Sequence, residues 1–229
     1  MSRSGPGPSP ASQRTLFLAG EGDGWFERNR VALAGVDAAA DPVVRALAGL
    51  PPPQRILEIG CADGWRLERL RQSTGAACFG VEPSATAVAE GAERFPSLTL
   101  ARGTADRLPF ADDEFDAVVF GFCLYLCDPS DHFRIAAEAD RVLAEGGWMV
   151  IYDFLPPRPW RNPYAHREGL YSHKMDYARM FTWHPSYRVH EVSRAEAGAQ
   201  PAAPDDRIAV TVLRKLRREA FPDNPYRRP

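Results

Sequence analysis

Short apolar runs alternate with helical patterns through most of the chain, which predicts strands separated by helices. We expect strands near residues 55–60, 77–82, 97–102, 115–122 and 148–154, and helices near 43–50, 64–73 and 84–93. A further helix is expected to open at Asp128-Pro129 and to end at Gly146-Gly147, and its apolar face is Ile135, Ala136, Ala139, Val142 and Leu143. Alternation of this kind predicts an α/β fold with a parallel sheet and helices on both faces.

The pattern changes after residue 154. Residues 155–186 are rich in Pro, Tyr, His and Arg and are expected to form a long irregular insertion on the substrate side of the domain. Two strand candidates follow at 187–192 and 207–213, joined by a flexible Ala/Pro-rich loop over 195–206. Because these late strands lie close together in sequence, they predict an antiparallel pair at the edge of a seven-stranded, mostly parallel sheet.

The length of 229 residues suits one domain. Residues 1–13 are rich in Ser, Pro and Gly and are expected to be a disordered tail. We expect a single domain over 14–229, with an N-terminal cap segment over 21–50 and the insertion at 155–186. Within the cap, Asp41 and Pro42 have the residue types of a helix N-cap and first helical position.

Composition and charge exclude several classes of protein. The net charge of −2 provides no field to gather nucleic acid, and no apolar run is long enough to cross a membrane. No cysteine pair has CxxC spacing and the histidines are not spaced for zinc, so we expect no metal. The expectation is a cytoplasmic protein, monomer or homodimer, with reduced thiols at Cys61, Cys78, Cys123 and Cys127.

A glycine turn follows the first strand and provides the first candidate site. Glu58 and Gly60 end the apolar run, and Gly64 opens the next helix. A dinucleotide-binding fingerprint counted from Gly60 would need glycines where this chain has Ala62 and Trp65. The pattern Glu58-x-Gly60-x-x-x-Gly64 instead resembles motif I of the class I S-adenosylmethionine-dependent methyltransferases.

Two further segments strengthen the resemblance, which covers residues 55 to about 154. The second strand ends at Glu82-Pro83, and Asp106 precedes a Leu-Pro-Phe block and a Phe-Asp-x-Val strand. The resemblance implies a Rossmann-like fold, S-adenosylmethionine as methyl donor and S-adenosylhomocysteine as product. It implies that Glu82 accepts from the ribose hydroxyls and Asp106 from the adenine amino group. The cofactor-binding residues it implies are Glu58, Gly60, Cys61, Ala62, Gly64, Glu82, Pro83, Ala105, Asp106 and Phe122.

The chemistry of methyl transfer indicates which other residues the site needs. The methyl group of a sulfonium is already activated, so the protein chiefly holds acceptor and methyl in line. A hydroxyl acceptor also needs a general base within hydrogen-bond reach. His173, Asp153 and His132 are the candidates, although a plain surface histidine is the more ordinary reading of His132.

Acceptor selection is expected from the insertion and the end of the fourth strand. Basic and aromatic residues are interleaved in the insertion, which suits an anionic acceptor such as a phosphorylated or nucleotide-linked small molecule. The Trp-Phe-Glu-Arg-Asn segment at 25–29 and the strand end at 121–126 resemble methyltransferases of bacterial surface-sugar or secondary-metabolite pathways, which implies a sugar-nucleotide or secondary-metabolite intermediate. A solvated flap or a dimer contact is an equally good reading of the insertion. The candidate substrate-binding residues are Tyr125, Arg161, Tyr164, Lys174 and Tyr177.

Two other functions stay open on the sequence. An NAD-type oxidoreductase shares the strand, the glycine turn and the ribose acid, but it is disfavoured by Ala62, Trp65 and the Leu-Pro-Phe block. A non-catalytic S-adenosylmethionine-binding partner protein could keep the same cofactor site. The sequence does not reveal the acceptor or whether oxygen, nitrogen or carbon is methylated.

Overall fold

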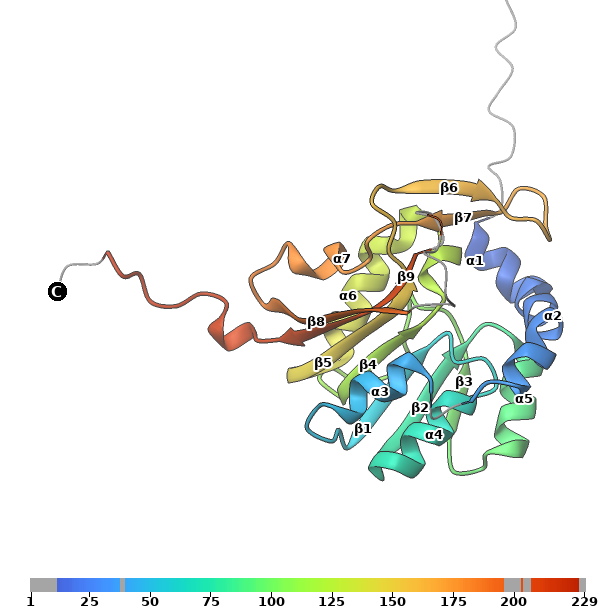
Figure 1. The fold of residues 1–229 in the computed structure, drawn as a ribbon, viewed down its shortest axis with the longest axis horizontal. Coiled ribbons are helices and arrows are strands. Elements are labelled where there is room, and N and C mark those ends of the chain that lie inside the picture. The colour runs from blue at the N-terminus through green and yellow to red at the C-terminus, as the bar shows by residue number, and fades with distance from the viewer. Residues whose placement is uncertain (1–11, 38–39, 196–202, 204–206, 227–229) are drawn as a thin grey trace, which may run out of the picture.

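A seven-stranded sheet forms the centre of the molecule (Figure 1). The computed structural model describes residues 12–37, 40–195, 203 and 207–226. Strands β1 to β5 are parallel, β9 is antiparallel to β5, and β8 is antiparallel to β9. In spatial order the strands are β3 (Thr99–Arg102), β2 (Ala77–Glu82), β1 (Arg55–Ile59), β4 (Phe115–Gly121), β5 (Leu143–Phe154), β9 (Ile208–Lys215) and β8 (Tyr187–Ala195).

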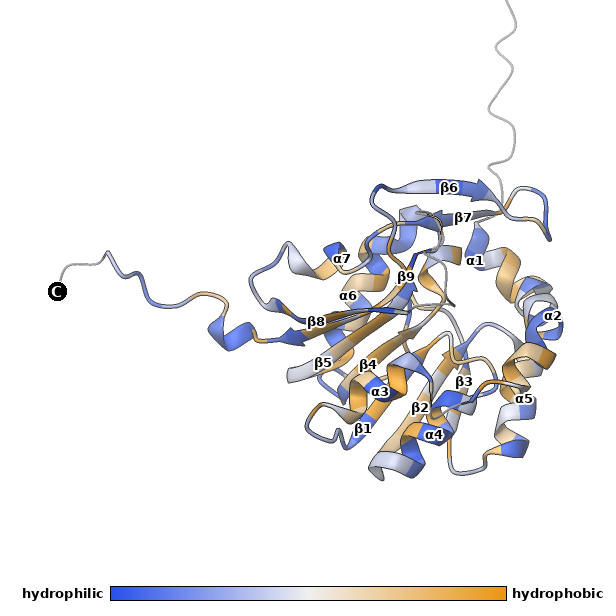
Figure 2. Ribbon diagram, in the orientation of Figure 1, coloured by the Kyte–Doolittle hydropathy of each residue, from blue (hydrophilic) through white to orange (hydrophobic). Residues whose placement is uncertain are grey.

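Helices cover both faces of this sheet because successive strand residues point to opposite sides. On one face, Ile56 and Val150 pack with α3 (Pro42–Ala48) and α4 (Trp65–Thr74). On the other, Leu57 and Met149 pack with α6 (His132–Val142) and α7 (Arg179–Thr182). The apolar strands appear as the hydrophobic centre of Figure 2. The predicted α/β architecture and antiparallel C-terminal pair are therefore confirmed.

The N-terminal segment runs past the carboxyl ends of the parallel strands. It consists of α1 (Gln13–Leu16), a π-helical turn η1 (Phe17–Glu21) and α2 (Gly22–Ala34). Helix α2 packs against α5 (Ala85–Arg94). The sequence placed Gln13 in a disordered tail, but it begins α1 and is buried. Residues 1–11 of that tail lie outside the described residues.

Residues 155–186 contain regular structure that the sequence did not predict. Strands β6 (Trp160–Pro163) and β7 (Tyr171–Lys174) form an antiparallel pair, which Figure 1 shows beside α1. The backbone N–H of Tyr171 donates to Oε1 of Gln13 at 2.9 Å, which joins the two segments. Strands of four residues such as these have no extended alternation of apolar and polar positions, so periodicity could not reveal them. Most of the loop expected at 195–206 lies outside the described residues.

The junction between α6 and β5 differs from the prediction. The helix ends at Val142, and β5 begins at Leu143 rather than at Trp148. Leu143 is fully buried and pairs with Phe115, and the register then shifts before Trp148 pairs with Ala117. Gly146, at φ +76°, lies inside this irregular strand instead of ending a helix. A bulge that uses a left-handed glycine gives the same sequence signal as a helix C-cap.

Short 3₁₀ turns complete the chain. Turn η2 (Leu124–Leu126) follows β4, η3 (Pro129–Asp131) precedes α6, and η5 (Arg217–Glu219) follows β9. No helix among the described residues is both long and apolar enough to cross a membrane.

Candidate functional site

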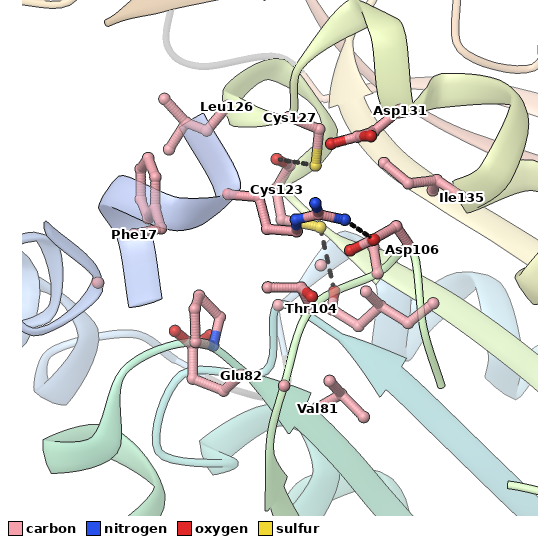
Figure 3. Close-up of a pocket in the computed structure, with 18 of the residues that line it drawn as sticks. Phe17, Val81, Glu82, Thr104, Asp106, Cys123, Leu126, Cys127, Asp131 and Ile135 are labelled. Carbon is pink, nitrogen blue, oxygen red and sulfur yellow. Dashed lines mark hydrogen bonds and ion pairs between the residues drawn. The ribbon is translucent and has the colours of Figure 1, made fainter. Parts of the chain in front are cut away.

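A cavity lies at the carboxyl ends of β1, β2 and β4, where the strand order of the sheet reverses. It encloses about 800 Å³ of empty space, counting its open mouth. Figure 3 shows Glu82, Asp106 and Cys127 facing this space from three separate segments. We call it the cofactor cavity. A reversal of strand order is where open α/β sheets bind their ligands.

The glycine turn reaches this cavity through Gly60. Gly60 has φ +75° and Gly64 has φ +81°, a region that disfavours other residues. A Cβ on Gly60 would lie 2.5 Å from the Cβ of Cys123. Gly60 is therefore required by both conformation and space, and its bare backbone leaves room for a ligand to pass.

Glu82 joins the end of β2 to the glycine turn. Its Oε2 accepts from the N–H of Ala62 at 3.1 Å, and its Oε1 accepts from the N–H of Ser84 at 3.0 Å. Burial raises the pKa of Glu82 to about 7. The carboxylate lines the cavity, so it can also accept hydrogen bonds from ligand hydroxyls.

Asp106 also lines the cavity and is paired with a residue that the sequence did not single out. The Arg14 guanidinium of α1 forms an ion pair with Asp106, and Arg134 lies 3.8 Å from the same carboxylate oxygen. Gln13 fixes α1 there, because its Nε2 donates to the carbonyl of Leu126 at 2.7 Å and its N–H donates to Asp128 at 3.1 Å. Arg14 lies at the edge of the low-complexity tail, where no motif signals a role.

Glu58 lies behind the glycine turn and does not line the cofactor cavity. It is fully buried and forms an ion pair with Arg66, whose Nε lies 3.1 Å from Asp41 Oδ1. Burial raises the pKa of Glu58, and the Arg66 charge opposes that shift. The cluster ties β1 to α4 and to the N-cap of α3 behind the glycine turn.

A second, aromatic cavity adjoins the cofactor cavity. Its wall includes Trp25, Trp65, Phe122, Tyr125 and Tyr152, and it encloses about 1180 Å³ with its open mouth. The residues lining both cavities are Trp25, Gly60, Gly121 and Phe122. The two spaces therefore meet at the end of β4.

Most of the predicted cofactor residues line one or both of these spaces. Cys61 and Ala62 line the aromatic cavity, and Gly64 lines neither. Gly64 instead precedes α4, where the backbone turns from left-handed to helical. Those that line the cofactor cavity are Gly60, Glu82, Pro83, Ala105, Asp106 and Phe122.

None of the three candidate bases lines either cavity. Asp153 is buried at the end of β5 and accepts hydrogen bonds from backbone N–H groups. His132 is buried with its ring 5.6 Å from that of Tyr177, and His173 lies on β7. Burial lowers the pKa of both histidines, so each favours the neutral form that a base requires. Their catalytic roles stay predictions.

Of the predicted substrate residues, Tyr125 alone lines one of these two cavities. The Tyr164 hydroxyl is 2.9 Å from Arg28 Nη2, and the Arg161 guanidinium lies 4.6 Å from the ring of Tyr171. Lys174 is buried with Nζ 3.9 Å from the ring of Phe154. Tyr177 is buried in the core. The insertion therefore packs against the cavity walls rather than lining them.

The structure also reveals lining residues that sequence reasoning missed. Phe17 comes from η1, and Leu126, Asp131 and Ile135 come from the segment after β4. These residues belong to no motif; only the fold brings them together. Among the described residues, no group of three or more His, Cys, Asp or Glu side chains could hold a metal ion.

The cavity fits S-adenosylmethionine on its own geometry. The glycine turn leaves no room for a side chain at Gly60, and the Glu82 and Asp106 carboxylates both line the same space. A carboxylate is the natural acceptor for a ribose diol or an adenine amino group. Residues 56–147 match the family described as a methyltransferase domain.

Proteins with similar sequences are also named as methyltransferases. The demethylmenaquinone methyltransferase of Mycolicibacterium paratuberculosis is 31% identical over 182 residues, which cover 79% of this chain and 76% of that protein. A demethylmenaquinone methyltransferase of Beutenbergia cavernae is 33% identical over 143 residues, or 62% of this chain, and the match spans little more than half of that protein, 58%.

A solved structure shares the fold. The Burkholderia thailandensis 1,6-didemethyltoxoflavin-N1-methyltransferase, solved with 1,6-didemethyltoxoflavin and S-adenosylhomocysteine bound, superposes with a TM-score of 0.70 at 16% identity. The match covers 92% of this chain and 94% of that one. These findings set aside the NAD-type oxidoreductase and the non-catalytic binding partner. The chain belongs to the S-adenosylmethionine-dependent methyltransferases, and it is an enzyme of that class.

Proposed function

We propose that this enzyme methylates a small molecule with a planar aromatic ring. The observation that carries the proposal is the cluster of rings where the two cavities meet. The ring of Phe122 lies 5.0 Å from Tyr125, 5.2 Å from Tyr152 and 5.0 Å from Phe154. Aromatic side chains favour offset or edge contacts at these distances, and a planar ligand can join such a cluster.

The acceptors named for two relatives support this class. One relative is named for demethylmenaquinone, and the other is a structure with 1,6-didemethyltoxoflavin bound. The basic residues that favoured a sugar nucleotide contribute less than expected, because Arg161 and Lys174 lie over aromatic rings outside both cavities. We therefore place the aromatic acceptor ahead of the sugar nucleotide.

The roles of the residues follow from their positions. Glu82 and Asp106 hold the nucleoside in the cofactor cavity, and Gly60 lets the chain of the donor pass toward the aromatic cavity. Bound S-adenosylmethionine supplies an activated methyl group. Phe122 and Tyr125 hold the acceptor so that its nucleophilic atom faces the methyl carbon in line with the breaking carbon–sulfur bond. Trp25 covers both cavities and excludes water.

The test is a transfer assay with S-adenosylmethionine labelled in its methyl group. A panel would compare a demethylated quinol, a fused-ring nitrogen heteroaromatic compound and a sugar nucleotide, with the product mass as readout. We expect label on a ring compound and none on the sugar nucleotide. Label on the sugar nucleotide alone would contradict the proposal.

Tyr125 separates acceptor binding from cofactor binding. Tyr125→Ala removes one wall of the aromatic cavity, so we expect the acceptor KM to rise about tenfold, in line with loss of a buried aromatic contact. The affinity for S-adenosylhomocysteine should change little. Tyr226→Ala, at an exposed site, is the control. An unchanged acceptor KM would remove this wall from the acceptor site.

A further inference from the structure

Asp153 is bonded to backbone groups rather than facing a cavity. Its Oδ2 accepts from the N–H groups of Leu124 at 2.9 Å and Tyr125 at 3.4 Å, and its Oδ1 accepts from the N–H of Phe154 at 2.8 Å. The side chain is 2% exposed. A general base must reach the acceptor proton, so this position favours a role other than proton transfer.

The turn that Asp153 holds connects the two cavities. Phe122 lines both of them, Tyr125 lines the aromatic cavity, and Leu126 lines the cofactor cavity. Phe122 has φ +67°, which is a strained conformation for a bulky residue. Such strain persists only where the surrounding structure fixes the backbone. The two bonds from Leu124 and Tyr125 to Asp153 are among the contacts that fix it.

We propose that Asp153 is a positioning residue whose carboxylate holds residues 122–126 in the shape that binds both ligands. Its effect on the acceptor rests on the proposed function. Its effect on the cofactor rests only on the cofactor cavity. Cofactor affinity is therefore the measurement of choice, because it stays valid if the acceptor class is wrong.

The protonation state of Asp153 makes the role testable. Burial raises the pKa of Asp153 to about 7, while the three backbone bonds and the Lys174 charge oppose the shift. Protonation places a hydrogen on one oxygen, which then faces N–H donors and loses a bond. The turn should therefore loosen as the pH falls below 7. The ionisable groups facing Asp153 are Lys174 of β7, Tyr125 of η2, Tyr152 of β5, Tyr177, Cys123 and Cys127.

Protonation of Asp153 changes the stability of the fold in the direction opposite to its expected effect on cofactor affinity. The folded protein binds this proton more tightly than the unfolded chain, so the contribution of Asp153 to stability is largest at low pH and is lost as the pH rises toward 7. A structural role alone would leave cofactor affinity unaffected by this titration. A positioning role makes affinity fall on acidification while this stability contribution grows.

The test measures S-adenosylhomocysteine binding by calorimetry. It compares Asp153→Asn with the unaltered protein at about pH 6 and at about pH 8.5. The variant cannot ionise, so we expect it to bind about tenfold more weakly at high pH, as for a lost charge-assisted bond, and within about twofold at low pH. Glu82 titrates in both proteins, so the ratio of affinities isolates Asp153.

Asp116→Asn is the matched control. Asp116 Oδ2 also accepts two backbone N–H groups, from Gln54 and Arg55 at 2.9 Å each, but at the far edge of the sheet. This variant should bind like the unaltered protein at both pH values. A constant ratio for Asp153→Asn at both pH values, or no loss at high pH, would overturn the proposal.

A second measurement avoids any variant that fails to fold. Amide hydrogen exchange of Leu124 and Tyr125 in the unaltered protein, corrected for the intrinsic pH dependence of exchange, should show lower protection at pH 6 than at pH 8.5. The Gln54 and Arg55 amides should keep equal protection. Equal protection of Leu124 and Tyr125 at both pH values would also contradict the proposal.

Discussion

Carboxylates accept backbone hydrogen bonds at both ends of the parallel strands, which we call the amino edge and the carboxyl edge of the sheet. The surroundings of these carboxylates differ between the two edges. At the amino edge, Asp116 accepts the backbone N–H groups of Gln54 and Arg55 at positions that solvent reaches. At the carboxyl edge, Glu82 and Asp153 make equivalent bonds while buried, and the pKa of each is raised to about 7. Burying a carboxylate costs free energy, which the amino edge avoids. The difference indicates that the amino edge stabilises the fold, whereas the carboxyl edge gives up stability to form a site.

The glycine turn gives the largest expected effect. Gly60→Ala places a Cβ against Cys123 at φ +75°, and we expect a loss of ~2–4 kcal/mol of unfolding free energy and no measurable S-adenosylhomocysteine binding. Gly75→Ala is the control, because Gly75 has φ +74° but nothing within 4 Å of a Cβ. It should cost about 1 kcal/mol and leave binding intact. Equal losses in chemical denaturation would show that Gly60 serves conformation alone.

The second-largest effect is expected at Glu82, where the pH dependence of binding tests the role of the carboxyl edge. Glu82→Gln should weaken S-adenosylhomocysteine binding about tenfold at pH 8.5, because the amide accepts fewer hydrogen bonds from the ribose. In the unaltered protein, affinity should fall as Glu82 is protonated below pH 7. The raised pKa means that its contribution to stability is lost between about pH 4.5 and 7 as the pH rises. Calorimetry and thermal unfolding over this range should therefore show opposite slopes for this group, and parallel slopes would contradict the assignment.

Asp116 provides the matching prediction at the amino edge. Asp116→Asn should lower the unfolding free energy by about 1 kcal/mol, the usual value of a hydrogen bond to backbone. We expect no change in S-adenosylhomocysteine affinity. Chemical denaturation and calorimetry on one preparation measure both quantities. A loss of cofactor affinity without a loss of stability would show that the two edges are not separate in function.

Arg14 gives the smallest expected effect. Its side chain is 35% exposed, so solvent screens its ion pair with Asp106. Arg14→Ala should weaken S-adenosylhomocysteine binding about threefold, because Asp106 loses the cation that orients it. Arg134→Ala is the control, since Arg134 lies 3.8 Å from Asp106 and is more exposed. Tighter binding in Arg14→Ala would instead mean that Arg14 competes with adenine for Asp106.

Much of the carboxyl edge follows from local sequence. Glu58, Gly60 and Glu82 stand at the ends of apolar strands, and parallel strands bring such ends to one edge. Periodicity also predicted the strands of the sheet and their order in the chain. It failed at the junction after Val142, because a left-handed glycine inside a bulged strand has the same sequence signal as a helix end. It failed again in the insertion, where polar strands carry no period.

The sequence by itself determined the class of fold, the glycine turn and the strand-end acids, because these depend on residues close together in the chain. Only the tertiary structure decided that Arg14 meets Asp106 across 92 positions, that Asp153 bonds to the turn after β4 rather than lining a cavity, and that Phe122 lines both cavities. These contacts join segments far apart in sequence. Local propensity and spacing do not predict these contacts, because the packing of the whole sheet decides which segments meet.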